Sequence, residues 1–294
     1  MKTLFIVNPI SGGKKQPAGR WADLISTYFP QAEIKYTQYA GHATELASHA
    51  VQNGYEKIFV AGGDGTINEV ARALVGTSVI LGIVPKGSGN GLARELAIPL
   101  CFEKALAALQ KAQAVSCDVG LANGEYFFNV AGVGIEAEIA RQFDQFGKSG
   151  KRGKWPYFKL GIEGFFHYKP ASLRLQYEGK EEIICPLTLV FANGTQYGSG
   201  FYIAPQASLT DGKLEMVEVK NVSKIRLAWA APAFFRKKPL PNTVQRTQSV
   251  TQAVLQADGE IVYHLDGEPK VAQHRLEIKL LPHALRLLVP TGEH

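Results

Sequence analysis

The 294-residue sequence predicts a parallel α/β domain followed by a mostly antiparallel β-domain, most simply a β-sandwich. The first hundred residues alternate short apolar runs with helical patterns, which indicates a parallel sheet covered on both faces. After about Val115 the helical patterns become fewer and β-rich runs follow one another, which is typical of an antiparallel domain. The length also favours two domains over one.

The elements of the first domain follow from its apolar periodicity. Strands are expected at Leu4–Val7, Ile34–Thr37, Ile58–Ala61 and Val79–Val84, and helices at Trp21–Tyr28, Ala43–Val51 and Ile67–Leu74. Glycine-rich loops follow the first, third and fourth strands. Because the carboxyl ends of parallel strands share one edge of the sheet, where ligands bind, we expect these loops to lie close together.

The second domain is expected to consist mainly of short strands. The β-rich runs are Leu173–Tyr177, Leu187–Ala192, Leu214–Val219, Ile261–Leu265, Leu276–Leu281 and Leu285–Val289. The change of pattern lies within residues 113–130, so the domains are placed at residues 1–125 and 126–294, with the last strand free to return to the first domain.

Composition limits the class of partner and the compartment. The net charge of +6 favours an anionic partner, such as a nucleotide, a nucleic acid or an anionic lipid surface. Nucleic acid is the least favoured of these, because the sequence has no arginine-rich arm, zinc-finger spacing or aromatic RNA-binding motif. Three scattered cysteines are typical of reduced thiols in a cytosolic protein.

Hydropathy predicts a soluble cytoplasmic protein that is at most peripheral to a membrane. The first apolar run, Leu4–Val7, is stopped by Asn8 and Pro9 and is too short for a secretory signal. The apolar runs of the sequence all fall short of the roughly 20 residues that span a bilayer.

The loop GGDGT, Gly62 to Thr66, has the chemistry of a phosphate site. Its three glycines permit backbone conformations in which successive N–H groups face one anion. The following helix adds a positive dipole end, worth about 0.3–1 kcal/mol for a bound negative charge. Asp64 would repel phosphate unless it holds Mg²⁺. The alternative is an Asp-Gly turn in which Asp64 and Thr66 cap the helix; we favour phosphate binding.

Two further loops combine glycines with polar side chains in the same way. NPISGGKK, residues 8–15, lacks P-loop spacing but offers Gly12, Gly13 and the Ser11 hydroxyl, and a flexible turn with solvated lysines explains it equally well. PKGSGNGLAR, residues 85–94, has three glycines with Ser88 and Asn90 as polar groups, followed by a short helix. Three such loops at one sheet edge predict a phosphate-binding crevice.

These segments resemble the lipid-kinase family that includes bacterial diacylglycerol kinases, YegS-like lipid kinases, sphingosine kinases and ceramide kinases. The resemblance runs in order through NPISG, GGDGTINE, PKGSGNGLAR, CDVG at 117–120, NVAGVG at 129–134, QASLTDGKLE at 206–215 and HLDGEP at 264–269. GGDGT alone is shared with NAD kinases, whereas the ordered set with the late DGE is far more specific. Asn90-Gly91 is closer to sphingoid-base kinases, because bacterial diacylglycerol kinases generally have asparagine and then aspartate there.

The resemblance implies a set of site residues. Glu268 would accept the proton of the lipid hydroxyl, Asp266 would assist it or contact metal, and Asp64 would serve the transfer step. A structural Mg²⁺ would be bound by the Asp211 carboxylate and the backbone carbonyls of Ser208 and Lys213. The implied ATP contacts are Asn8, Pro9, Ile10, Ser11, Gly12, Thr37, Gly62, Gly63, Asp64, Gly65, Thr66, Ile67, Asn68, Glu69 and Ser88.

The function implied is that of an ATP- and Mg²⁺-dependent lipid kinase acting on diacylglycerol or a related lipid, with a role in phospholipid biosynthesis. The alternatives are a sphingoid-base kinase, an NAD kinase and a non-catalytic nucleotide-responsive lipid-binding protein. Ordinary hairpin turns are the alternative explanation for both the Asp266–Glu268 and the Ser208–Lys213 segments. The sequence leaves open whether the chain forms a homodimer.

Two basic and aromatic segments are candidates for peripheral membrane contact. KSGKRGKWPYFKLGIEGFF, residues 148–166, combines Lys148, Lys151, Arg152 and Lys154 with five aromatic residues. KIRLAWAAPAFFRKK, residues 224–238, flanks a short apolar run with Lys224, Arg226, Arg236, Lys237 and Lys238. The alternative is that the aromatic residues pack on the β-domain while the charges are solvated.

Overall fold

The computed structural model describes residues 2–12, 18–87, 89–148, 168–197 and 201–291. The chain divides into two compact units. Unit 1 comprises Met1–Val119 and Pro282–His294, and unit 2 comprises Gly120–Leu281. Two long strands, β5 (Gln113–Ala122) and β14 (Glu268–Val289), have residues in both units.

Unit 1 contains a wholly parallel sheet in the order β2-β1-β3-β4-β14. Its short strands are β1 (Thr3–Val7), β2 (Glu33–Tyr36), β3 (Lys57–Gly62) and β4 (Ile80–Pro85). The end of β14 completes the sheet through the pairs Arg286–Ile80 and Leu287–Leu81. The central strands are almost entirely buried, as their continuous apolar runs require. The predicted parallel α/β fold is confirmed.

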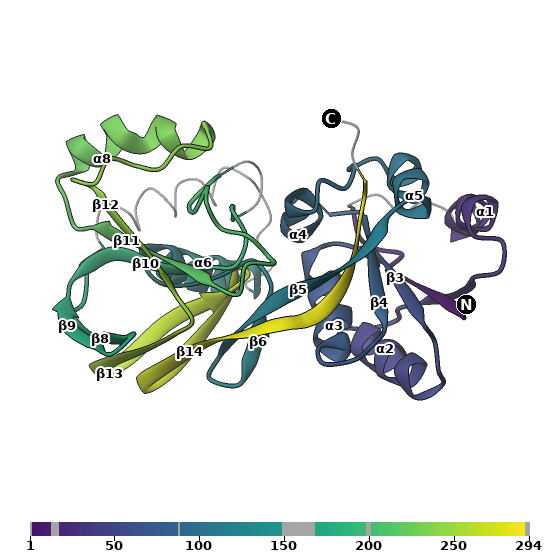
Figure 1. The fold of residues 1–294 in the computed structure, drawn as a ribbon, viewed down its shortest axis with the longest axis horizontal. Coiled ribbons are helices and arrows are strands. Elements are labelled where there is room, and N and C mark those ends of the chain that lie inside the picture. Colours follow the sequence, from purple (N-terminus) through teal and green to yellow (C-terminus); the bar gives the residue numbers. More distant parts are fainter. Residues whose placement is uncertain (1, 13–17, 88, 149–167, 198–200, 292–294) are drawn as a thin grey trace. The chain divides into compact units, whose positions relative to one another are not determined.

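Helices cover both faces of this sheet (Figure 1). They are α1 (Ala18–Tyr28), α2 (His42–Gln52), α3 (Asp64–Leu74), α4 (Gly91–Glu95) and α5 (Phe102–Gln110). In Figure 1, α2 and α3 lie on one side of the strands, and α4 and α5 lie on the other. The buried positions of α3, Ile67, Val70, Ala71 and Leu74, have the spacing of one helix face. The sequence analysis did not predict α5.

Unit 2 is antiparallel, as predicted. Its main order is β12-β11-β10-β7-β13-β14, with β8 and β9 attached to β13 and the hairpin β5–β6 attached to β14. The remaining strands are β6 (Glu125–Phe127), β7 (Val130–Gly134), β8 (Leu173–Tyr177), β9 (Lys180–Ile184), β10 (Pro186–Ala192), β11 (Leu214–Lys220), β12 (Gln245–Val250) and β13 (Gln252–Leu265).

Alternation along β10 shows how unit 2 builds two cores. Leu189 and Phe191 belong to one buried apolar cluster, while Val190 and Ala192 belong to another. Successive side chains of a strand point to opposite faces, so the strand contributes to both clusters. Helices α6 (Ile135–Lys148) and α8 (Lys224–Ala230) and the 3₁₀ helix η1 (Ala231–Phe235) complete the described elements.

The predicted β-rich runs Leu276–Leu281 and Leu285–Val289 are both strand, and they are parts of the single strand β14. This strand contains Pro282, which has no N–H to donate to a sheet ladder. At the next residue, His283 adopts a φ of +54° and donates its N–H to the Asp118 carboxylate at 2.8 Å.

Candidate functional site

The three glycine-rich loops of unit 1 contact one another. The Asn8 side-chain amide donates to the Thr66 hydroxyl at 2.9 Å, which joins the loops after β1 and β3. The N–H of Gly63 donates to the Ser11 hydroxyl at 3.3 Å. Gly12 has a φ of +89°, and a Cβ there would lie 2.7 Å from the Lys86 carbonyl oxygen. The loop after β1 therefore packs against both of its neighbours.

Asp64 joins the loop after β3 to the loop after β4. Its two carboxylate oxygens accept the N–H groups of Asn90 at 2.9 Å and Gly91 at 2.7 Å, at the start of α4. The N-cap of α3 is Gly63, with no side-chain cap hydrogen bond, so Asp64 does not cap that helix. Each carboxylate oxygen keeps a further lone pair, so the group can also bind a hard cation such as Mg²⁺.

The glycines of these loops are required mainly by space. A Cβ on Gly62 would lie 2.7 Å from Thr66 Cβ, one on Gly87 would lie 2.9 Å from Gly63 Cα, and one on Gly89 would lie 2.6 Å from an Asp64 oxygen. None of these three glycines has a left-handed φ, in contrast to Gly12 of the loop after β1. Close approach of the loops, rather than unusual φ, selects glycine here.

A cavity of about 340 Å³ adjoins the loops. Lys86 donates to the Asn8 carbonyl at 3.0 Å, and its Nζ lies 4.2 Å from the Trp21 ring centroid. Burial lowers the pKa of Lys86. The second cation of the lining, Arg94, donates to the Gly89 carbonyl at 2.9 Å. The full lining is Ser11, Gly12, Trp21, Pro85, Lys86, Gly87, Asn90, Arg94, Leu100 and Phe102.

Sequence reasoning did not single out Lys86, Arg94 or Trp21. Lys86 and Arg94 both lie within the segment PKGSGNGLAR, and their positive charge beside its glycines was the available signal. Nothing in the sequence placed Trp21 beside them, because that contact joins α1 to the end of β4.

The other predicted ATP contacts have different surroundings. Glu69 accepts the N–H groups of Gly41 at 3.0 Å and Ala43 at 3.2 Å, at the start of α2. Ile67 and Asn68 lie on the buried face of α3. Thr37 is partly buried and donates its N–H to the Val7 carbonyl at 3.0 Å.

Three residues complete the predicted set in unit 1. Pro9 and Ile10 form the turn after Asn8, with the Ile10 side chain 71% exposed. A Cβ on Gly65 would meet nothing within 4 Å, so this position faces open space. Ser88 lies outside the described residues.

In unit 2, Asp266 and Gly267 form the two-residue turn between β13 and β14. Leu265 pairs with Glu268, and φ is positive at both central residues, +49° and +89°, as a type I′ turn requires. The Asp266 carboxylate accepts three backbone N–H groups, from Phe128 (2.8 Å), Asn129 (2.8 Å) and Val130 (3.0 Å). Asp266 therefore anchors the turn at the start of β7, and half-buried Glu268 follows it.

The segment with the predicted structural Mg²⁺ is an exposed turn. Asp211 accepts the Lys213 N–H at 3.1 Å, and the Ser208 hydroxyl accepts the Thr210 N–H at 3.3 Å. This leaves one free carboxylate oxygen and the backbone carbonyls as cation ligands. Over the described part of the chain, no three His, Cys, Asp or Glu side chains gather into a metal-binding group.

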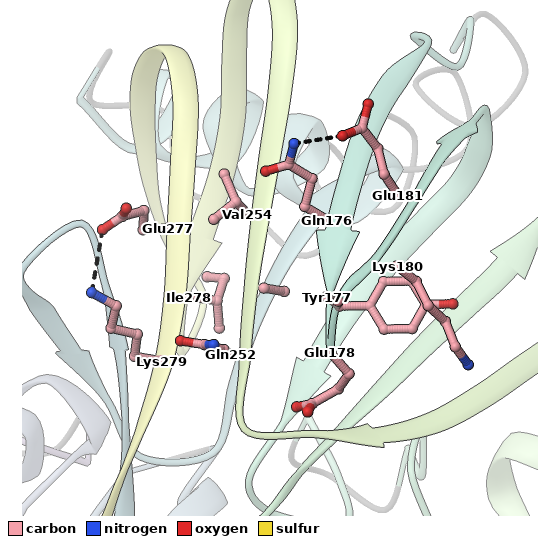
Figure 2. Close-up of a pocket in the computed structure, with 12 residues that line it drawn as sticks. Gln176, Tyr177, Glu178, Lys180, Glu181, Gln252, Val254, Glu277, Ile278 and Lys279 are labelled. Carbon is pink, nitrogen blue, oxygen red and sulfur yellow. Dashed lines mark hydrogen bonds and ion pairs between the residues drawn. The ribbon is translucent and has the colours of Figure 1, made fainter.

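Unit 2 also has an open pocket of about 440 Å³ beside the β8–β9 hairpin (Figure 2). Two of its carboxylates are paired with protein: Glu181 accepts from Gln176 at 2.8 Å, and Glu277 lies 3.6 Å from Lys279. The described residues that line it include none of the predicted site residues. We therefore assign the pocket no role.

The two segments proposed for membrane contact differ in how much of each the structure describes. Residues 149–167, most of the first segment, lie outside the described residues. In the second, three large apolar side chains are strongly exposed: Ile225 (83%), Trp229 (82%) and Phe235 (66%). Arg226, Arg236, Lys237 and Lys238 are exposed as well. Helices in the described ranges are all too short or too polar to cross a bilayer.

A parallel α/β unit followed by a β-sandwich unit is the architecture of a class of lipid kinases. Residues 2–122 match the diacylglycerol kinase catalytic domain, and residues 129–289 match the YegS C-terminal NAD kinase beta sandwich-like domain. The chain belongs to the YegS-like and diacylglycerol kinase family of lipid kinases.

Relatives match over nearly the whole length. A protein of Citrobacter koseri named "Probable lipid kinase YegS-like" is 30% identical, over 98% of this chain and 96% of its own. A diacylglycerol kinase of Mycobacterium tuberculosis is also 30% identical, over 98% and 95%. A solved structure of a diacylglycerol kinase from Bacillus anthracis has a TM-score of 0.76 at 20% identity, with 99% of this chain and 97% of that chain covered, and so shares the fold.

Proposed function

We propose that this chain is an ATP-dependent lipid kinase that transfers the γ-phosphate of ATP to a hydroxyl of diacylglycerol or a related lipid. Membership of the lipid-kinase family supports the proposal. The observation that carries it is the contact of three glycine-rich loops, held together by Asp64, Asn8 and Ser11, beside a cavity with Lys86 and Arg94 in its lining. Such a product would be consumed in phospholipid synthesis.

The loops of unit 1 would bind the triphosphate. Lys86 and Arg94 supply positive charge, and the glycines allow backbone to approach phosphate closely. When bound, Mg²⁺ neutralises charge on the transferring phosphoryl group. Asp64 would hold this ion, since its carboxylate is fixed by two amides and still has lone pairs.

Glu268 would accept the proton of the attacking lipid hydroxyl. A positioned general base contributes typically about 10²–10⁴-fold to such a step. Asp266 has a different task in this proposal: its carboxylate is held by three backbone amides, so it orients the turn from which Glu268 follows. The Ser208–Lys213 turn would bind a structural Mg²⁺ through Asp211.

One observation favours a second acceptor class. Asn90-Gly91 replaces the Asn-Asp sequence of bacterial diacylglycerol kinases, and Gly91 donates its N–H to Asp64. A sphingoid base is therefore the alternative acceptor. NAD as acceptor has no such support.

The acceptor stays in a bilayer, so the enzyme must reach a membrane surface. The exposed apolar side chains of α8 and η1, flanked by four exposed basic residues, would contact an anionic interface. Each lysine or arginine near such a surface is worth about 1 kcal/mol.

Substitution Glu268→Gln tests the base. The expected result is loss of phosphate transfer by about 10²-fold or more, with ATP affinity within a few-fold of wild type, because Gln is isosteric but cannot accept the proton. Transfer is followed with γ-labelled ATP, and ATP binding by calorimetry. Glu260→Gln, at an exposed carboxylate of β13, is the control. Wild-type turnover in Glu268→Gln would remove Glu268 as the base.

A further inference from the structure

His264 contacts the turn that precedes Glu268. It lies near the end of β13, is 2% exposed, and accepts the Gly267 N–H on Nδ1 at 3.2 Å. A neutral imidazole that accepts on Nδ1 carries its proton on Nε2. Burial lowers the pKa of His264 to about 4, so the ring is neutral near pH 7.

Glu136 lies on the other side of this ring. Gly132 of β7 is the cross-strand partner of His264, and a Cβ on Gly132 would lie 2.6 Å from Glu136 Oε1 and 2.9 Å from His264 Nε2. The carboxyl and the ring nitrogen thus approach the same point, which is open only because residue 132 is glycine. Burial raises the pKa of Glu136 to about 8.

These polar atoms are buried together. Within the described structure, both Glu136 oxygens, His264 Nε2 and the Tyr197 hydroxyl lack a hydrogen-bond partner, while the Tyr197 and His264 rings lie 5.7 Å apart. The nearby Thr188 hydroxyl donates to the Val133 carbonyl at 3.2 Å. Buried polar groups are almost always hydrogen-bonded, so the Nε2 proton needs an acceptor, and we assign the Glu136 carboxyl to it because Oε1 and Nε2 approach the same point beside Gly132.

We propose that His264 is a positioning residue for Glu268, and that Glu136 fixes the His264 ring. Asp266 already anchors the first half of the turn through three amides. His264 holds the second half through Gly267, which is exposed and has a φ of +89°. Glu268 is the next residue, so the orientation of its side chain depends on this hydrogen bond. The catalytic part of this inference rests on the proposed function.

Two isosteric variants separate the two ring nitrogens. In His264→Asn the side-chain oxygen can take the place of Nδ1, whereas in His264→Gln the amide reaches only the place of Nε2. We expect the Gly267 amide to exchange slowly with solvent deuterium in the wild type and in His264→Asn, and faster in His264→Gln. His49→Gln, at an exposed histidine of α2, is the control.

The turnover number kcat should also be close to wild type in His264→Asn and reduced in His264→Gln. In His264→Gln, kcat is expected to fall by about 10²-fold with KM for ATP unchanged, because a small displacement of the base costs about that factor. His264→Asn should recover most of kcat. Equal exchange of the Gly267 amide and equal kcat in the two variants would overturn the proposal.

A further measurement uses the unaltered protein. It therefore depends neither on the folding of a variant nor on phosphate transfer. The ¹⁵N resonances of His264 should show protonated Nε2 and unprotonated Nδ1 near pH 7. Protonated Nδ1 would overturn the proposal even if the protein phosphorylates lipid. If the protein does not phosphorylate lipid but the Gly267 amide exchanges slowly, the proposed function is overturned. The role of His264 in the turn then still stands.

Discussion

Asp64 and Asp266 each hold a glycine-rich segment in place by accepting backbone N–H groups. Asp64 accepts two backbone amides and Asp266 accepts three. Each carboxylate joins its own loop to a second segment of the same unit. The sequence singled out both aspartates as site residues. Their amide donors lie 26 to 27 residues away for Asp64 and 136 to 138 residues away for Asp266. Contacts this distant in sequence could not be predicted.

At the same scale, Glu136 predicts a pH dependence of stability. Its pKa is raised by burial from 4.5 to about 8, so the folded state holds the proton longer than the unfolded state does. Between these pH values the free energy of unfolding should fall as pH rises, by an amount on the order of a few kcal/mol. Tyr168, Tyr197 and His264 face Glu136 and keep their charge states from pH 5 to 9, because their pKa values lie outside this range.

The measurement is urea unfolding of wild type and Glu136→Gln at pH 5, 7 and 9. Because glutamine does not ionise, the variant should gain stability relative to wild type as pH rises. Glu138→Gln is the control on the same helix, since its pKa is lowered by hydrogen bonds from Arg141 and it stays ionised over this range. A constant difference between Glu136→Gln and wild type would show that Glu136 titrates normally.

At the scale of elements, the loops after β1, β3 and β4 form one interlocked group. Parallel strands predicted that the loops would share an edge, and the glycines predicted close approach of backbone. At Gly87 and Gly63 glycine is needed because one loop packs against another without a left-handed φ, whereas Gly12 also has a φ of +89°. Lys86 and Trp21 could not be paired from sequence, because their contact depends on how α1 packs.

Substitution Asp64→Asn tests whether this carboxylate holds the loops after β3 and β4 together. Asparagine has one acceptor oxygen in place of two, so the N–H of Asn90 or Gly91 loses its partner, at a cost of about 1–3 kcal/mol. We expect a lower melting temperature, a higher KM for ATP and weaker Mg²⁺ dependence of turnover. Asp23→Asn, at an exposed aspartate of α1, should leave all three unchanged. Loss of turnover with unchanged stability would assign Asp64 to chemistry alone.

At the scale of the whole chain, the order of motifs predicted more than any motif did. Apolar periodicity predicted the parallel unit and the antiparallel unit, and the order of motifs predicted the family; all three predictions are confirmed. The sequence pattern did not predict that β14 continues past Pro282 as one strand, in which the next residue, His283, donates its N–H to the Asp118 side chain. It also did not predict α6, whose Glu136 is buried beside β7.

The exposed surface of α8 and η1 predicts binding to anionic membranes. Trp229→Ala and Arg236→Ala should each weaken cosedimentation with vesicles that contain phosphatidylglycerol, by about fivefold for one basic residue if it contributes about 1 kcal/mol. Vesicles of phosphatidylcholine alone should bind weakly. Ile183→Ala, at a 73% exposed apolar residue of β9, is the matched control. Equal binding by all three variants would place the contact elsewhere.

The most direct test of the central claim is a transfer assay with competing acceptors. Purified protein, Mg²⁺ and γ-labelled ATP are incubated with mixed vesicles of diacylglycerol and a sphingoid base, with NAD in solution, and the products are separated by chromatography. The account predicts label in a phosphorylated lipid, foremost phosphatidic acid, and its loss in Glu268→Gln. Label in NADP, or bound ATP that is never consumed, would contradict it.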